Sequence, residues 1–381
     1  MAPAAGAGIQ MERRHDDMIM IGNKKLSRLQ KIIITLLSAL LILGCFATAA
    51  SAAEAGAADE VYLGGMPFGV KFFTEGVMVV GYSDVQTPSG VKNPAKEAGI
   101  RPRDVITRIG GETVAGADAL VKRVESCGGK ELTFTVKRHN PKKTGADAAV
   151  ELDIKVKPIQ SAEGGEYKSG LVVRDRGAGI GTVTYIVPSG GLFGGLGHGI
   201  CDSDTGELVP MQRGTVTDVT ISGVDKGKAG TPGALKGYFE PGKIGALVGN
   251  TVCGVFGVLS RLPDGCDTKT VKIGHRDEVK EGKATVRCTL DGGEIGEYEI
   301  NISAIDRREQ GSKCFTVTVT DPRLIEKTGG IVQGMSGSPI IQNGKLVGAV
   351  THVMVNDPTV GYGIFIENML AQSQMPMSKA S

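Results

Sequence analysis

The sequence predicts a mostly β protein with two domains behind an N-terminal targeting segment. The 381 residues include 57 Gly and no Trp, and aromatic residues make up only 4%, a balance that suits short strands and turns better than long helices. From Val61 onward, apolar residues come in short runs bounded by Gly and other turn formers, which is typical of strands. The net charge of +2 comes from 43 basic and 41 acidic residues, so charge gives no reason to expect a nucleic-acid partner.

Residues 1–58 are predicted to be a tail and an export segment. Basic residues at 24–31 precede an apolar run at 32–43, and small residues follow up to Ala52. This is the layout of a signal peptide, although about 20 weakly polar residues could also span a membrane as a retained anchor. A loose lipoprotein cleavage box ends at Cys45. We therefore expect an exported protein that is either membrane-associated or secreted.

Residues 59–158 are predicted to form a compact domain of strands with two short helices. Asn93 can cap a helix that has Pro94 at its first position and ends at Gly99. Apolar spacing predicts a second helix within residues 115–129, and strands are expected before, between and after these helices.

This first domain resembles a bacterial PDZ domain. Phe68, Gly69 and Val70 match the Gly-Φ-Gly-Φ loop that binds a carboxylate, although Pro67 replaces the first Gly, and residues 98–111 match a second PDZ segment. The resemblance implies that a peptide end pairs with the edge after Gly69 while N–H groups of the loop bind its carboxylate. The alternative is a PDZ-shaped spacer that has no ligand.

A polar, Gly-rich linker is expected at residues 157–165, and residues 167–372 are predicted to be the second domain. Many short apolar runs separated by turns, with hardly one helical period, predict a sandwich or barrel there. The six Cys residues beyond the export segment form no C-x-x-C pair, so no structural zinc is expected.

A Gly-rich loop at residues 334–339 carries the main chemical signal. Its sequence Gly-Met-Ser-Gly-Ser-Pro lies between predicted strands and resembles the Gly-Asp-Ser-Gly-Gly-Pro loop of trypsin-like serine peptidases. This resemblance implies a chymotrypsin-like double β-barrel with Ser336 as the nucleophile and the N–H groups of Gly334 and Ser336 as the oxyanion hole. Met335 stands where digestive zymogens carry an Asp, and Met cannot form their activating ion pair with a new N-terminus.

Two of the five histidines fall at positions that matter in trypsin-like enzymes. His198 lies in a Gly-rich segment downstream of a predicted strand, where those enzymes carry their general base. The alternative is a structural histidine whose ring forms hydrogen bonds within a Gly-rich turn. His352 falls where those enzymes line the primary specificity pocket, so it is expected to be a substrate contact.

The order of export segment, PDZ domain and peptidase, with His198 before Ser336, resembles the stage IV sporulation protein B (SpoIVB) peptidase family. Residues 329–370 and 195–200 carry the most specific part of the resemblance. It implies a signalling serine endopeptidase of sporulation, secreted into the space between forespore and mother-cell membranes. There it would cleave a membrane regulatory protein, and itself, to trigger sigma-factor maturation. No cofactor or metal is implied.

The third member of the catalytic triad is less well defined by the sequence. The family resemblance favours Asp321, which follows a predicted strand fifteen residues upstream of Ser336. Asp202 and Asp204, near His198, are rivals. Asp321 could instead be a capping acid before Pro322.

Two other functions fit parts of the pattern. A general envelope quality-control protease is one, although such proteases usually carry the peptidase before the PDZ domain. A non-catalytic PDZ scaffold is the other, although both a nucleophile and a base candidate are present.

Overall fold

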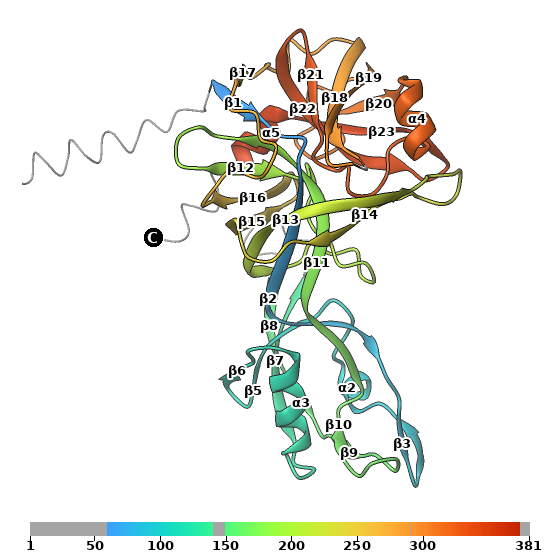
Figure 1. Cartoon of the computed structure of the whole chain (residues 1–381). Coiled ribbons are helices and arrows are strands. Elements are labelled where there is room, and N and C mark those ends of the chain that lie inside the picture. Colours follow the sequence, from blue (N-terminus) through green and yellow to red (C-terminus); the bar gives the residue numbers. More distant parts are fainter. Residues whose placement is uncertain (1–58, 140–148, 291, 374–381) are drawn as a thin grey trace, which may run out of the picture. The chain divides into compact units, whose positions relative to one another are not determined.

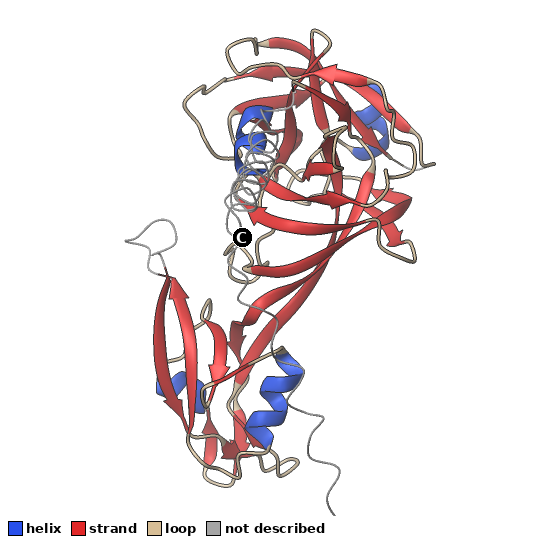
Figure 2. Ribbon diagram, turned by 90° about the vertical axis from the view of Figure 1, so that its left-hand side faces the viewer, coloured by secondary structure: helices blue, strands red, loops and turns tan. Residues whose placement is uncertain are grey.

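The computed structural model of the chain describes residues 59–139, 149–290 and 292–373. The predicted export segment lies outside these described residues. Strands dominate the described part and its helices are short (Figure 2), so the predicted mostly β class is confirmed. Nowhere in the described part is a helix both long and apolar enough to cross a membrane.

A first β-barrel is built from strands that are far apart in the sequence. They are β2 (Pro67–Tyr82), β11 (Leu171–Ile186), β12 (Leu192–Gly195), β13 (Met211–Asp225), β15 (Gly245–Thr251) and β16 (Gly254–Leu259). Antiparallel pairing runs in the order β2, β11, β12, β16, β15, β13, and β13 pairs again with β2, which closes the ring. Phe68, Val70, Val183, Phe193 and Val255 are buried in its core.

A second closed barrel follows without interruption by another domain. Its strands are β18 (Gly282–Thr289), β19 (Ile295–Ser303), β20 (Phe315–Val319), β21 (Pro339–Gln342), β22 (Lys345–Met354) and β23 (Asp357–Phe365). They pair in the order β18, β19, β20, β23, β22, β21. Counted along the chain, both barrels therefore have the strand order 1-2-3-6-5-4, and the predicted chymotrypsin-like double barrel is confirmed.

The PDZ domain is inserted between the first two strands of the first barrel. It contains the C-terminal part of β2, β5 (Val105–Ile109), β6 (Glu112–Thr113), β7 (Leu132–His139), β8 (Ala149–Val156) and the N-terminal part of β11, together with α2 (Pro94–Ala98) and α3 (Ala117–Glu125). Val77, Ile106, Leu120 and Phe134 belong to its separate core. β2 and β11 pair from Pro67↔Thr182 to Tyr82↔Leu171, and Figure 1 shows them side by side along this length.

The predicted domain boundaries at 59–158 and 167–372 are corrected by this topology. β1 (Glu60–Leu63) pairs with β11 and with β17 (Thr270–Lys272), and the N-terminal part of β2 is a strand of the first barrel. The expected linker contains β9 (Ile159–Gln160), which pairs with β10 (Tyr167–Lys168). The chain thus enters the PDZ domain along β2 and leaves it along β11.

The predicted carboxylate-binding loop at Phe68, Gly69 and Val70 is wrong. These residues lie within β2, where Gly69 is paired with Ile180 on one side and with Thr217 on the other. Both edges of the strand are therefore occupied, and Phe68 and Val70 are buried. Gly69 is required for packing, because a Cβ there would lie 2.2 Å from the Phe239 ring.

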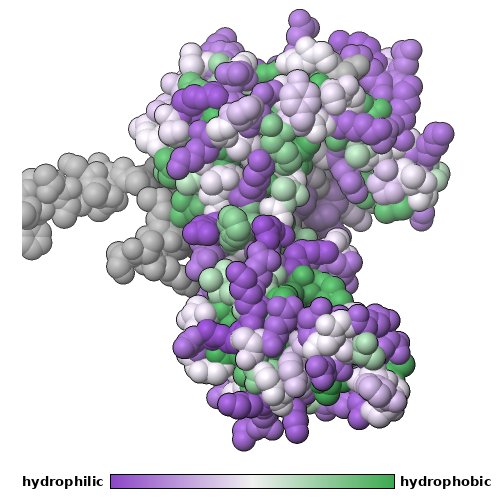
Figure 3. All heavy atoms as spheres, turned by 60° about the horizontal axis from the view of Figure 1, so that its bottom comes forward, coloured by the Kyte–Doolittle hydropathy of each residue, from purple (hydrophilic) through white to green (hydrophobic). Residues whose placement is uncertain are grey.

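The remaining elements are short strands and helices attached to the barrels and to the PDZ domain. β3 (Val85–Thr87) pairs with β4 (Gly90–Lys92), and β14 (Ala234–Phe239) pairs antiparallel with β13. α4 (Pro322–Thr328) follows β20, and α5 (Ile366–Ser373) follows β23 of the second barrel. The predicted cap of α2 is confirmed, since the Asn93 side chain accepts a hydrogen bond from the Lys96 N–H. In the view of Figure 3, hydrophilic residues cover much of the face and hydrophobic residues form smaller groups between them.

Candidate active site

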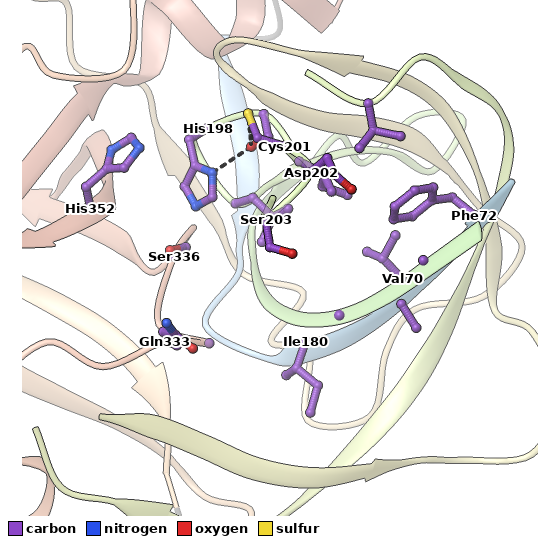
Figure 4. A pocket seen from close by; sticks show the side chains of 18 of the residues that line it. Val70, Phe72, Ile180, His198, Cys201, Asp202, Ser203, Gln333, Ser336 and His352 are labelled. Carbon is purple, nitrogen blue, oxygen red and sulfur yellow. Dashed lines mark hydrogen bonds between the residues drawn. The ribbon is translucent and has the colours of Figure 1, made fainter. Parts of the chain in front are cut away.

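The predicted nucleophile and base line one cavity. This cavity has a volume of about 810 Å³, and both barrels contribute to its wall. Val70, Phe72, Ile180 and His198 come from the part of the chain that builds the first barrel, while Gln333, Ser336 and His352 come from the part that builds the second (Figure 4). Asp321 is not among the lining residues.

Ser336 lies in a tight loop between α4 and β21. The loop is closed by hydrogen bonds from the Met335 N–H to the Val332 carbonyl (3.1 Å) and from the Ser338 N–H to the Met335 carbonyl (2.9 Å). Gly334 and Gly337 have φ angles of 99° and 93°, in the left-handed region that favours glycine. The Ser336 hydroxyl donates a hydrogen bond to the Thr351 carbonyl at 2.8 Å.

Two N–H groups of this loop are free to bind a substrate oxygen. The N–H groups of Met335, Gly337 and Ser338 all donate to backbone carbonyls. Those of Gly334 and Ser336 have no hydrogen-bond acceptor among the described residues. This is the pair that the sequence predicted as the oxyanion hole, and free N–H groups beside a serine can stabilise a developing oxyanion.

His198 is held in one tautomer by a backbone carbonyl. Its Nδ1 lies 2.9 Å from the Gly199 carbonyl oxygen, and because a carbonyl only accepts, Nδ1 carries the proton and Nε2 has a free lone pair. Figure 4 shows this second ring nitrogen turned toward Ser336. Burial lowers the pKa of His198 from its ordinary value of 6.5, so the ring is neutral at pH 7 and can accept a proton.

An irregular turn directs His198 into the cavity. Leu196 and Gly197, which follow β12, have φ angles of 65° and 67°. A left-handed conformation is uncommon for Leu and is found where surrounding contacts impose it, often at functional sites. Here the turn follows the third strand of the first barrel and places the next residue, His198, beside the second barrel.

His352 lies next to His198 on the cavity wall, and its role as a substrate contact stays a prediction. The two imidazole rings are 4.8 Å apart between centroids. The Nδ1 atom of His352 is buried and has no hydrogen-bond partner within the described part of the chain. Burial, followed by the proximity of His198 and Lys313, lowers the pKa of His352 to about 4. At neutral pH the cavity therefore has a second uncharged imidazole on its wall.

The structure does not bring Asp321 to His198, which corrects its assignment as the triad acid. The Asp321 carboxylate accepts hydrogen bonds from the Arg323 N–H (2.9 Å), the Arg323 guanidinium (2.7 Å) and the Glu299 N–H (3.2 Å). Asp321 is the N-cap of α4, and the bond with Arg323 lowers its pKa to about 2. The capping role, which the sequence allowed as an alternative, is the one that the geometry shows.

The rivals Asp202 and Asp204 do not contact His198 either. Asp202 accepts hydrogen bonds from the N–H groups of Asp204 and Thr205, both at 3.0 Å, and is paired with Arg174. Asp204 also pairs with Arg174, at 2.7 Å. Within the described residues the hydrogen-bond partner of the His198 ring is thus a backbone carbonyl and not a carboxylate.

Two groups at the site could not be found from the sequence. The Gly199 carbonyl fixes the imidazole, and the Thr351 carbonyl accepts a hydrogen bond from the Ser336 hydroxyl. Backbone carbonyls leave no residue-specific signal, and only the fold places them. In the described part, no group of three or more His, Cys, Asp or Glu side chains could hold a metal ion.

Comparison with known proteins identifies both domains by family. A family model described as the SpoIVB peptidase S55 matches residues 165–370, and a model of the PDZ domain matches residues 90–138. The PDZ match lies wholly inside the insertion between β2 and β11. The peptidase match begins shortly before β11, the strand that leaves this insertion, and includes His198 and Ser336.

Individual relatives are distant. A probable CtpA-like serine protease of Staphylococcus saprophyticus is 37% identical over 59 residues, which are 15% of this chain and 12% of that protein. The structure of the HtrA-type protease AlgW with a decapeptide is 13% identical, covers 55% of each chain and has a TM-score of 0.32. The active form of the Rv3671c protease from M. tuberculosis is 15% identical, covers 51% of this chain and 73% of that one and has a TM-score of 0.26.

Proposed function

The chain belongs to the SpoIVB peptidase S55 family and is a serine peptidase with a PDZ domain, and from this premise we propose that Ser336 and His198 hydrolyse peptide bonds within a protein substrate. The observation that carries the proposal is the free pair of N–H groups at Gly334 and Ser336, in the same cavity as the neutral His198. Free N–H groups beside a nucleophile can stabilise the negative charge that develops on a carbonyl oxygen during acyl transfer.

The reaction begins with a rotation of the Ser336 hydroxyl from the Thr351 carbonyl toward His198. Nε2 of His198 accepts the hydroxyl proton while Oγ attacks the substrate carbonyl carbon, and the carbonyl oxygen becomes an oxyanion bound by the Gly334 and Ser336 N–H groups. His198 then gives its proton to the leaving amine, and the peptide bond breaks. A water molecule releases the acyl group from Ser336 by the same steps.

The Gly199 carbonyl takes over one of the two roles of a triad carboxylate, which is to orient the imidazole. It holds the Nδ1 proton, so the tautomer with a basic Nε2 is fixed. Because a carbonyl carries no full charge, it stabilises the imidazolium less than a carboxylate does. A slow enzyme is the expected result, and such a rate suits a peptidase that cleaves few bonds.

The biological role that we propose is signalling during sporulation. The enzyme would be exported by the segment at residues 23–52 and act in the space between forespore and mother-cell membranes, on a membrane regulatory protein and on itself. Family membership and the accompanying PDZ domain support this role. The PDZ domain would select the protein substrate through a peptide end.

The catalytic proposal is tested by labelling the full chain with a fluorophosphonate and locating the label by mass spectrometry. Ser336 should be labelled, and Ser336→Ala should lose the label. Ser338→Ala is the matched control, because the Ser338 hydroxyl is fully buried and has no hydrogen-bond partner among the described residues. A wild-type protein without label at Ser336, or loss of the label in Ser338→Ala alone, would refute the assignment.

The signalling role is tested in a sporulating host. Replacing the resident enzyme by Ser336→Ala should stop maturation of the late sigma factor and leave bulk degradation of misfolded envelope proteins unchanged. The opposite pattern would identify a quality-control protease.

A further inference from the structure

Two buried threonines of β11 contact the active-site loop and have no part in the proton transfers described above. Thr182 and Thr184 are 2% and 0% exposed. The Thr182 hydroxyl donates to the Gly334 carbonyl at 2.8 Å, and the Thr184 hydroxyl donates to the Gly337 carbonyl at 2.7 Å. Because residues i and i+2 of a strand face the same side, one face of β11 presents both hydroxyls to the loop.

Thr182 holds the loop on both sides of the Ser336 amide. Its hydroxyl binds the carbonyl of the 334–335 peptide, and its own N–H donates to the Ser336 carbonyl, in the 336–337 peptide, at 2.9 Å. The peptide between these two, 335–336, carries the Ser336 N–H of the oxyanion hole. Since peptide units are planar, fixing both neighbours restricts the rotation of the unit between them.

The loop lies so close to β11 that only glycine fits at position 337. A Cβ on Gly337 would be 2.1 Å from the Thr182 carbonyl oxygen and 2.4 Å from the Leu196 nitrogen. The contacts of Thr182 and Thr184 are therefore buried, where a carbonyl that loses its donor is left without water as a substitute.

We propose that Thr182 and Thr184 are positioning residues for the oxyanion hole, holding the loop 334–337 in the conformation in which the Gly334 and Ser336 N–H groups face the cavity. The inference rests on the proposed catalytic role of Ser336. The two hydroxyls act only through the loop and touch neither substrate nor proton. Without them the loop carbonyls are unpaired, and conformations in which the N–H groups turn away become populated.

The test measures the rate of inactivation of the full chain by diisopropyl fluorophosphate, whose phosphoryl oxygen binds the same N–H pair. Thr182→Val and Thr184→Val keep the side-chain shape and remove the hydroxyl. Each should slow inactivation about tenfold, and the double variant more. Thr182→Ser restores the donor and should react within about twofold of the wild type.

Thr217→Val is the matched control. Thr217 is a buried threonine of the same barrel whose hydroxyl has no hydrogen-bond partner among the described residues, so its replacement should leave the rate unchanged. Diethyl pyrocarbonate provides a second readout, because it modifies the His198 imidazole without using the oxyanion hole. Its rate at His198 should stay unchanged in both Val variants of the loop contacts.

Three results would overturn the inference. The first is a wild-type rate of fluorophosphate inactivation in folded Thr182→Val or Thr184→Val. The second is an equal slowing in Thr217→Val, and the third is an equal slowing with both reagents, which would indicate general loosening of the barrel. If Thr182→Val does not fold, Thr184→Val carries the test. A wild-type chain that does not react at Ser336 would instead refute the catalytic proposal, and this inference with it.

Discussion

The two barrels have the same strand order, but only the second is built from one continuous stretch of the sequence. The second barrel is formed by one continuous stretch from β18 to β23. In the first barrel, the PDZ domain separates β2 from β11, although these two strands pair directly. The first barrel thus depends on contacts between residues that are about a domain apart in sequence, and the second does not.

The two barrels also contribute different parts of the site. The second barrel supplies the nucleophile loop, in which Met335 is fully buried. The first barrel supplies His198 and, through β11, the two threonines that hold that loop. β11 is also the strand that leaves the PDZ domain. The same strand therefore belongs to the inserted domain at one end and contacts the active-site loop at the other.

The contact between loop and β11 gives the largest expected effect of a single substitution. Gly337→Ala puts a Cβ 2.1 Å from the Thr182 carbonyl oxygen, at a φ of 93°. The loop must move, so inactivation by diisopropyl fluorophosphate should slow by about 10² or more. Gly344→Ala is the control: its φ is 74° and nothing lies within 4 Å, so it should cost only about 1 kcal/mol of stability. Equal rates in the two variants would contradict the close contact.

A substitution in β2 separates the two interpretations of its N-terminal part. Gly69→Ala places a Cβ 2.2 Å from the Phe239 ring at the end of β14, on the side of β2 opposite to Phe68 and Val70, and overpacking of this kind costs about 1 to 3 kcal/mol. Denaturant unfolding monitored on the whole chain should show this loss. If Gly69 belonged to a PDZ peptide-binding loop, the substitution would weaken peptide binding and leave stability unchanged.

The pH dependence of labelling reports the burial of His198 between the barrels. Attack by Ser336 needs neutral His198, and burial lowers the pKa of that ring below 6.5. The rate of fluorophosphate inactivation should therefore be full at neutral pH and fall as the pH drops through a midpoint below 6.5. A midpoint above 6.5 would point to a carboxylate partner that raises the pKa of the ring.

The smallest expected effect comes from Asp321. This carboxylate caps α4 and binds Arg323, and Asn is an equally good cap. Asp321→Asn should therefore change the inactivation rate by less than about threefold, whereas a triad acid would cost about 10⁴. A loss of that larger size, in a variant with unchanged thermal unfolding, would restore Asp321 to the catalytic machinery.

The sequence predicted the second barrel better than the first for a physical reason. Ser336 and the N–H groups of its loop depend on a local glycine pattern, and the hairpin that follows has turn residues at Asn343 and Gly344. His198 could also be predicted, because its place after a strand is local. Phe68 to Val70 could not be placed, since an alternating Gly and apolar pattern fits a PDZ loop and a crowded barrel strand equally well. The assignment of Asp321 as the triad acid was wrong for a similar reason. An acidic residue before Pro is compatible with a helix cap and with a catalytic triad, and only tertiary contacts distinguish the two roles.

The most direct test of the account compares two deletions by fluorophosphonate labelling of Ser336. One deletes residues 61–158, which removes β1 and the barrel part of β2 along with most of the PDZ domain. The other replaces residues 75–174 by Asn-Gly, a turn that can join two antiparallel strands directly. The structure predicts that the second variant folds and is labelled at a rate near that of the wild type, while the first is neither folded nor labelled. A labelled 61–158 deletion beside a folded but unlabelled 75–174 replacement would contradict the insertion of the PDZ domain into the first barrel.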